Sequence, residues 1–343
     1  MLYISTRNNI DSYTAYRALH EETAVDGGLY TPFRPLKSDL VSGWRELSAT
    51  EAIAQVLNSL FGLSLTGWDV ECAIGRTPFH TVEIGRRTTV TECWRNPGSS
   101  WHYLLESLYA CMCGKTSLQQ PVCGWARVAI EIAMLFGLCV QKEMASCECF
   151  DLCVAGGDFA TVAAALYAKD MGLPVGKILC VCDENGSFWD LIHRGEMNTS
   201  VESMNMKSPQ SITERPVYFE YLLHRAYGAD LVVEYLNACG RNSIFQLDEE
   251  QLPCLSSEIV AIVVSAGRTD AVVSSIHRTN GYIADPVLAF TYGGLQDYRA
   301  GSGIGNHTLL LGMESPVLSA DRLTKILSLS KNELIKQINS TKE

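Results

Sequence analysis

Apolar side chains recur at helical spacing in the first 140 residues of the chain. They fall every three or four positions between 49 and 61, after the capping-box pair Ser48 and Glu51 and before Gly62, so this segment is predicted to be an amphipathic helix. Two further helices are predicted, one from about Trp101 to Cys113 with Ser99 or Ser100 as its N-cap, and one at 125–138 that is apolar on nearly every face and therefore buried.

In the second half, short apolar runs alternate with helical patterns. The predicted strands are 150–154, 177–182, 258–264 and 308–311, and the predicted helices are 158–171, 216–227, 270–277, 285–299 with a break at Gly293-Gly294, and the tail from Ala320. Strands that alternate with helices favour an α/β fold, an open and mainly parallel sheet with flanking helices.

Composition limits the classes of function. The chain has 343 residues, long enough for two domains, with 47% hydrophobic and 19% charged residues and a net charge of −11. The negative charge argues against nucleic acid or an anionic membrane surface as the main partner. No apolar run approaches the roughly 18 residues of a membrane span. The first residues lack the apolar core of a signal peptide, so a cytoplasmic protein is expected.

Thirteen cysteines are present, and none is arranged as C-x-x-C. A disulfide-stabilised secreted domain would be much shorter, so we expect reduced and mostly buried thiols. A zinc site made of Cys147, Cys149 and Cys153 is the alternative, but these cysteines lack the usual spacing of zinc ligands. We therefore expect no metal.

Several blocks of residues, in order along the chain, resemble motifs of the threonine synthase family. Residues 3–7 match its opening Y-x-S-T-R, and residues 26–32 match D-G-G-L-Y-x-P. Further matches are 124–127 to N-W-A-R, 167–174 to Y-A-K-x-M-G-L-P, 183–185 to N-E-N, Ser208-Pro209 and Phe219-Glu220 to SPxMDI…SNFER, and 281–286 to G-Y…D-P. The resemblance covers most of the chain and implies common descent.

The resemblance implies a fold and a domain plan. The family has the fold type II architecture of enzymes that use pyridoxal phosphate (PLP), so we expect a threonine-synthase-like N-terminal domain at 1–95 and a remnant of the catalytic domain at 96–343. The family places a long stretch, with an S-G-D-T-G loop, between its catalytic lysine and the N-W-A-R block. Here only residues 103–123 separate these positions, so most of the small domain is expected to be missing.

The family's catalytic lysine has no counterpart in this sequence. The lysine lies in a segment that reads approximately ELFHGPTLAFKD, whereas residues 92–103 read ECWRNPGSSWHY. Aligned on Pro97, the lysine position falls on His102. An imidazole cannot form a stable aldimine, so PLP chemistry should be lost, and His102 becomes the candidate catalytic residue of a PLP-independent reaction.

The family's phosphate-binding segment, G-N-F-G-[ND], is altered as well. It falls on Gly157, Asp158, Phe159, Ala160 and Thr161, with Gly156 before them. A tight turn that opens a helix offers free N–H groups to an anion. The carboxylate of Asp158 would repel a phosphate there, so Asp158 is predicted to cap the helix instead.

Two later motifs and the positions of the other lysines also indicate a loss of PLP chemistry. The family's D-P-H-T-A becomes D-P-V-L-A at 285–289, and T-A-H-P-A-K-F falls on 313–319, where Met313 stands in place of a hydroxyl residue. Lys115, Lys142 and Lys177 are poorly placed to replace the missing lysine.

Together these changes predict a threonine-synthase-like protein that has lost PLP-dependent catalysis and binds a protein partner or a small metabolite, with no cofactor expected. One alternative is an active PLP-dependent lyase that makes threonine from O-phosphohomoserine. The other is a PLP-independent enzyme that uses His102.

Overall fold

The computed structural model describes residues 1–37, 43–76, 78–115, 121–140, 147–184, 186–200 and 217–340. Lys142, Asn185, Ser208-Pro209 and Pro216 lie outside the described residues.

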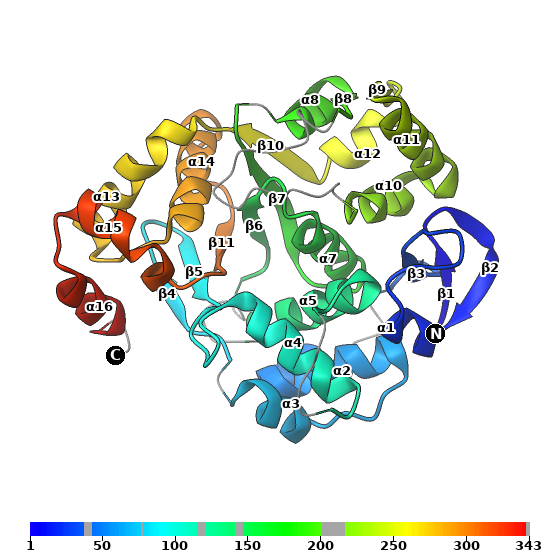
Figure 1. The fold of residues 1–343 in the computed structure, drawn as a ribbon, viewed down its shortest axis with the longest axis horizontal. Helices are drawn as coiled ribbons and strands as arrows, with labels where there is room; N and C mark the ends of the chain where they lie inside the picture. The colour runs from blue at the N-terminus through cyan, green and yellow to red at the C-terminus, as the bar shows by residue number, and fades with distance from the viewer. Residues whose placement is uncertain are drawn as a thin grey trace.

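A six-stranded sheet forms the centre of the molecule (Figure 1). Its order is β10 (Ile259–Val263), β7 (Val175–Cys182), β6 (Phe150–Ala155), β11 (His307–Gly312), β5 (Thr88–Glu92) and β4 (Thr81–Glu83). The first five strands are parallel, and β4 is antiparallel to β5. The predicted fold class and all four predicted strands are confirmed.

The sheet is buried on both faces, because successive side chains of a strand point to opposite sides. Along β6, Leu152 and Val154 join one apolar core, whereas Cys153 joins the other. In Figure 1, α5 (Gly124–Cys139) and α7 (Phe159–Asp170) cover one face, and α14 (Pro286–Ser302) covers the other together with α13 (Thr269–Asn280).

The three helices predicted before residue 140 are confirmed as α2 (Ala49–Phe61), α4 (Trp101–Met112) and α5. Ser48 and Glu51 form the capping box of α2, and Ser100 caps α4. The predicted tail helix is two helices, α15 (Ala320–Leu327) and α16 (Lys331–Ser340), and the helix predicted at 216–227 is α10 (Phe219–Tyr227).

The predicted break at Gly293-Gly294 is wrong, because α14 is continuous there. Gly294 instead allows α14 to pack closely on the sheet, whereas Gly293 faces Val272 of α13. A Cβ atom at Gly294 would lie 2.5 Å from the side chain of Val181 in β7, closer than real side-chain contacts.

The N-terminal region forms a small sheet in the order β2 (Asn8–Thr14), β1 (Leu2–Ser5), β3 (Tyr30–Pro32), next to α1 (Ala15–His20). The domain boundary at 95 stays a prediction; β4 and β5 lie on its N-terminal side and pair within the large sheet. The remaining elements are α3 (Gly67–Ile74), α8 (Ser187–Arg194), β8 (Glu196–Asn198), α11 (Ala229–Arg241), β9 (Ile244–Gln246), α12 (Leu252–Ser256) and the short 3₁₀ helices Trp44–Glu46, Ala266–Arg268 and Pro316–Ser319. Among the described helices, none is both long and apolar enough to span a bilayer.

Candidate functional site

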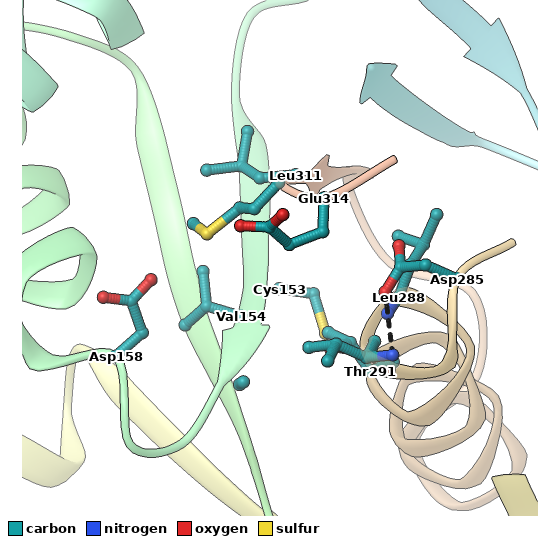
Figure 2. A pocket seen from close by; sticks show the side chains of 11 residues that line it. Cys153, Val154, Asp158, Asp285, Leu288, Thr291, Leu311 and Glu314 are labelled. Atoms are coloured by element: carbon teal, nitrogen blue, oxygen red, sulfur yellow. Dashed lines mark hydrogen bonds between the residues drawn. The ribbon is translucent and has the colours of Figure 1, made fainter. Parts of the chain in front are cut away.

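A small cavity lies at the carboxyl ends of β6 and β11, beside the start of α14. Its volume is about 30 Å³. Figure 2 shows three carboxylates around it, on three separate segments: Asp158, Asp285 and Glu314. The other lining residues are Cys153, Val154, Ala155, Val287, Leu288, Thr291, Leu311 and Met313. The cavity therefore brings together three of the altered motif segments that are far apart in the sequence.

The first segment is the turn between β6 and α7, which includes Gly156 and Gly157. As predicted, Asp158 is the N-cap of α7: its carboxylate accepts a bond from the Thr161 N–H at 3.4 Å. The N–H groups of Gly156 and Asp158 donate to the carbonyls of Val181 and Ala155 at 2.7 and 3.0 Å. Three N–H groups of this segment therefore have protein acceptors, and a carboxylate stands where an anion would have to approach. Phe159 and Ala160, also in the predicted phosphate-binding set, form the buried first turn of α7.

A partly buried ion-pair network supports this turn. Arg127 Nε donates to Glu131 Oε1 at 3.0 Å, and its Nη2 lies 3.7 Å from Asp158 Oδ1. Burial raises the pKa of Glu131, although Arg127 opposes the shift. The Thr161 hydroxyl lies 2.8 Å from Glu131 Oε2 and 2.7 Å from Asp158 Oδ2. The positive charge of Arg127 is thus shared between two carboxylates. Sequence reasoning missed Glu131, although a charged pair four residues apart on an otherwise apolar helix was a visible signal.

The second segment is the start of α14, where Asp285 is the N-cap. Asp285 is 3% exposed, and Oδ1 accepts bonds from the N–H groups of Val287 and Leu288 at 2.8 and 3.1 Å. Burial raises the pKa of Asp285 to about 6, and the nearby Glu314 carboxylate adds to the shift. The acid therefore holds its proton more tightly than an exposed aspartate does.

The third segment, Met313–Ser315, lies beside the loop that replaces the lysine segment. The Trp101 N–H donates to the Met313 carbonyl at 2.8 Å, and the Ser315 N–H donates to the Ser99 carbonyl at 3.3 Å. His102 Nδ1 lies 3.7 Å from Glu314 Oε1, but the His102 side chain is 63% exposed. His102 is therefore next to one wall of the cavity and is not among the residues that line it.

The described lining residues do not fit PLP. They include no lysine, arginine or histidine, and three carboxylates face the space that would have to receive a phosphate. A cavity of about 30 Å³ has room for a water molecule or two, whereas small-molecule pockets enclose roughly 300–1,000 Å³. Two other lysines that were considered are elsewhere: Lys115 is exposed after α4, and Lys177 donates to the Ser257 carbonyl.

The predicted alternative of a zinc site finds no support in the residues that the structure describes. Cys153 is buried, and Cys147 and Cys149 are partly exposed. Over the described ranges, no group of three or more His, Cys, Asp or Glu side chains is placed to hold a metal ion.

Two curated proteins that are similar in sequence to this chain carry the name threonine synthase or threonine synthase-like. The human protein "Threonine synthase-like 1" is 30% identical over 142 residues, which is 40% of this chain and 19% of that protein. "Threonine synthase" of Pseudomonas aeruginosa is 23% identical over 206 residues, 59% of this chain and 42% of that protein. The chain thus matches less than half the length of either relative. No family model matches the chain.

Solved structures of threonine synthases superpose over most of both chains. The PLP-bound threonine synthase of Brucella melitensis superposes with a TM-score of 0.78 at 18% identity, covering 96% of this chain and 92% of that one. The yeast threonine synthase superposes with a TM-score of 0.75 at 15% identity, covering 99% and 94%. At such low identity these matches establish the fold.

Proposed function

Since this chain belongs to the threonine synthase family, we propose that it is a member without PLP-dependent catalysis. In this proposal the protein is cytoplasmic and acts by binding a protein partner or a small metabolite.

The observation that carries the proposal is the convergence of the altered segments on one cavity. The turn at 156–161, the start of α14 and residues 313–315 lie around the same space of about 30 Å³. The changed residues that line it are Asp158 from the first segment, Val287 and Leu288 from the second, and Met313 and Glu314 from the third, whereas Asp285 matches the family motif. His102 stands beside Glu314 at the position of the family's lysine. Changes at scattered positions would have suggested drift of single motifs. Changes that surround one cavity support loss of the function of that cavity.

Electrostatics gives the second argument. Each unit of negative charge on a phosphate 4 Å from one carboxylate would be repelled by about 4 kcal/mol at an effective dielectric constant of 20. Asp158, Asp285 and Glu314 would all oppose its entry, but the family motif also has the aspartate at 285, so Asp158 and Glu314 are the carboxylates that distinguish this chain. Asp285 can lower its share of this cost by keeping a proton below pH 6, since its pKa is about 6.

Phosphate release tests the proposal against the active-lyase alternative. The purified chain would be mixed with PLP and O-phosphohomoserine, and inorganic phosphate and threonine would be measured. The proposal predicts no release above a protein-free control. Release that scales with protein concentration would refute it and favour the active lyase.

A His102→Lys variant sharpens this test, because it restores the missing amine without changing the cavity. We expect the variant to remain inactive, since Asp158 still caps α7 and the cavity is still small. Activity in the variant alone would mean that only the lysine had been lost and that the phosphate-binding segment still works.

The His102 alternative rests on a different observation. The imidazole is exposed and lies 3.7 Å from Glu314, and a carboxylate near a histidine can orient it as a general base. If an activity is found without PLP, His102→Ala should abolish it, while Glu314→Gln should change its pH profile. An activity that survives His102→Ala would exclude this role.

A further inference from the structure

Helices α3 and α4 pack against each other away from the cavity described above, and each carries a cysteine, Cys72 in α3 and Cys111 in α4. Cys111 lies in the last turn of α4, and its Sγ is 3.6 Å from the carbonyl oxygen of Asp69 in α3. Cys72 is three residues after Asp69 on the same helix. In an α-helix, a side chain at position i can reach the carbonyl at i−3 or i−4. The Cys72 thiol can therefore approach the carbonyl that Cys111 already contacts.

The exposure of the two thiols is unequal. Cys72 is exposed and Cys111 is partly buried. Burial raises the pKa of the Cys111 thiol, and Asp69 and Cys72 add to the shift. Cys72 is thus the thiol that a soluble oxidant meets first, and Cys111 is the neighbour placed to react with it.

We propose that Cys72 and Cys111 are a reversible redox pair that peroxide-class oxidants convert into a disulfide between α3 and α4. The Cys72 thiolate attacks one oxygen of hydrogen peroxide, the O–O bond breaks, and one water leaves, which gives a sulfenic acid on Cys72. The Cys111 thiol then loses its proton and attacks the Cys72 sulfur. The S–S bond forms, the S–O bond breaks, and a second water leaves. Two thiols lose two protons and two electrons, and one peroxide becomes two waters.

The disulfide would link the two predicted domains, residues 1–95 and 96–343. Helix α3 precedes residue 95, and α4 follows it and carries His102 in its first turn. A disulfide here would tie the end of α4 to the N-terminal region, and the oxidised protein should unfold at a higher temperature than the reduced one.

Peptide mapping of the full chain tests the proposal. The protein would be treated with hydrogen peroxide, its remaining thiols blocked, and the product digested with trypsin without reduction. Peptide 46–76 contains Cys72 as its one cysteine, and peptide 96–115 contains Cys111 and Cys113. We expect these two peptides to be linked, with the loss of two hydrogen atoms, and to separate after reduction.

Cys113→Ser is the matched control, because Cys113 lies in the same peptide two residues away. The link should survive Cys113→Ser and Cys254→Ser, the latter removing another exposed thiol. It should disappear in Cys72→Ser and in Cys111→Ser, with circular dichroism used to verify that each variant is folded. A link that persists in Cys111→Ser, or oxidation of other cysteines while 46–76 stays unlinked, would overturn the proposal. Since α3 and α4 pack together whether or not PLP binds, this result is independent of the proposed loss of catalysis.

Discussion

Replacing Asp285 with asparagine should stabilise the protein at neutral pH. Asp285 is 3% exposed, and its pKa is raised to about 6 from an ordinary value of 3.8. The folded protein therefore binds this proton more tightly than the unfolded chain does. Stability from this group is fully present below about pH 4 and falls as the pH rises towards 6. A shift of about two pH units corresponds to about 3 kcal/mol.

Asparagine keeps the helix cap and removes the charge. Its side-chain oxygen can accept the same bonds from Val287 and Leu288 that Asp285 Oδ1 accepts, and asparagine is as good an N-cap as aspartate. The lost attraction to the helix dipole costs about 0.3–1 kcal/mol. We therefore expect Asp285→Asn to raise the free energy of unfolding by about 2 kcal/mol at pH 7.5. At pH 4.5 we expect little change, because the wild-type carboxyl is then mostly protonated in the folded state.

Urea unfolding at the two pH values, followed by tryptophan fluorescence, would measure this difference. Asp230→Asn is the control, because Asp230 likewise lies at the start of a helix, in the first turn of α11, but is exposed. The reasoning is refuted if Asp285→Asn is less stable than wild type at pH 7.5, or if its effect is the same at both pH values. An equal effect at both pH values would mean that folding does not raise the pKa of Asp285, and a loss of stability at pH 7.5 would mean that the charged form contributes to stability.

Two further substitutions test the packing and the N-terminal ion pair. Gly294→Ala should destabilise the protein by about 1–3 kcal/mol, because its Cβ would lie 2.5 Å from Val181. Gly293→Ala is the control and should cost less in the same thermal unfolding assay, because its Cβ would lie 3.2 Å from its nearest neighbour. Equal losses of stability would contradict the close-packing explanation. Glu220→Gln should destabilise by about 2 kcal/mol, because the buried carboxylate accepts from Arg7 at 2.7 and 3.1 Å. Chemical denaturation would show this loss, and an unchanged midpoint would contradict the importance of the pair.

Much of the fold could be predicted from the sequence because its signals are local. The capping box at Ser48 and Glu51 and the apolar run of β6 both specify an element without reference to the rest of the chain. By contrast, β5 reads T-T-V-T-E and has only one aliphatic side chain, yet all five residues are buried. Its burial depends on pairing with β11, which is distant in the sequence, so no local pattern could reveal it.

The blocks that still match the family have a structural role in the N-terminal region. The Thr6 hydroxyl donates to Glu220 at 2.9 Å, and Arg7 pairs with the same carboxylate. A Cβ atom at Gly28 would lie 2.1 Å from Ser5 Oγ, so only glycine fits there. These residues hold the small sheet against α10. The sequence identified the matching blocks but could not distinguish this framework role from a catalytic one.

The convergence of the altered segments could be anticipated only through the resemblance. Asp158, Asp285 and Glu314 are spread over more than 150 residues, and each has a local explanation as a cap or a surface charge. Only the parallel sheet, with β6 next to β11, brings them around one cavity. The contact between His102 and Glu314 also depends on this tertiary arrangement.

Trapping with borohydride is the most direct test of the claim that PLP-dependent catalysis is lost. The purified chain would be incubated with PLP, reduced with borohydride, digested and mapped by mass spectrometry, with a functional threonine synthase as the positive control. The account predicts no lysine modified in proportion to protein beyond the scattered labelling of surface amines. A stoichiometric adduct on a single lysine would contradict it and would identify the residue that had taken over the role of the missing one.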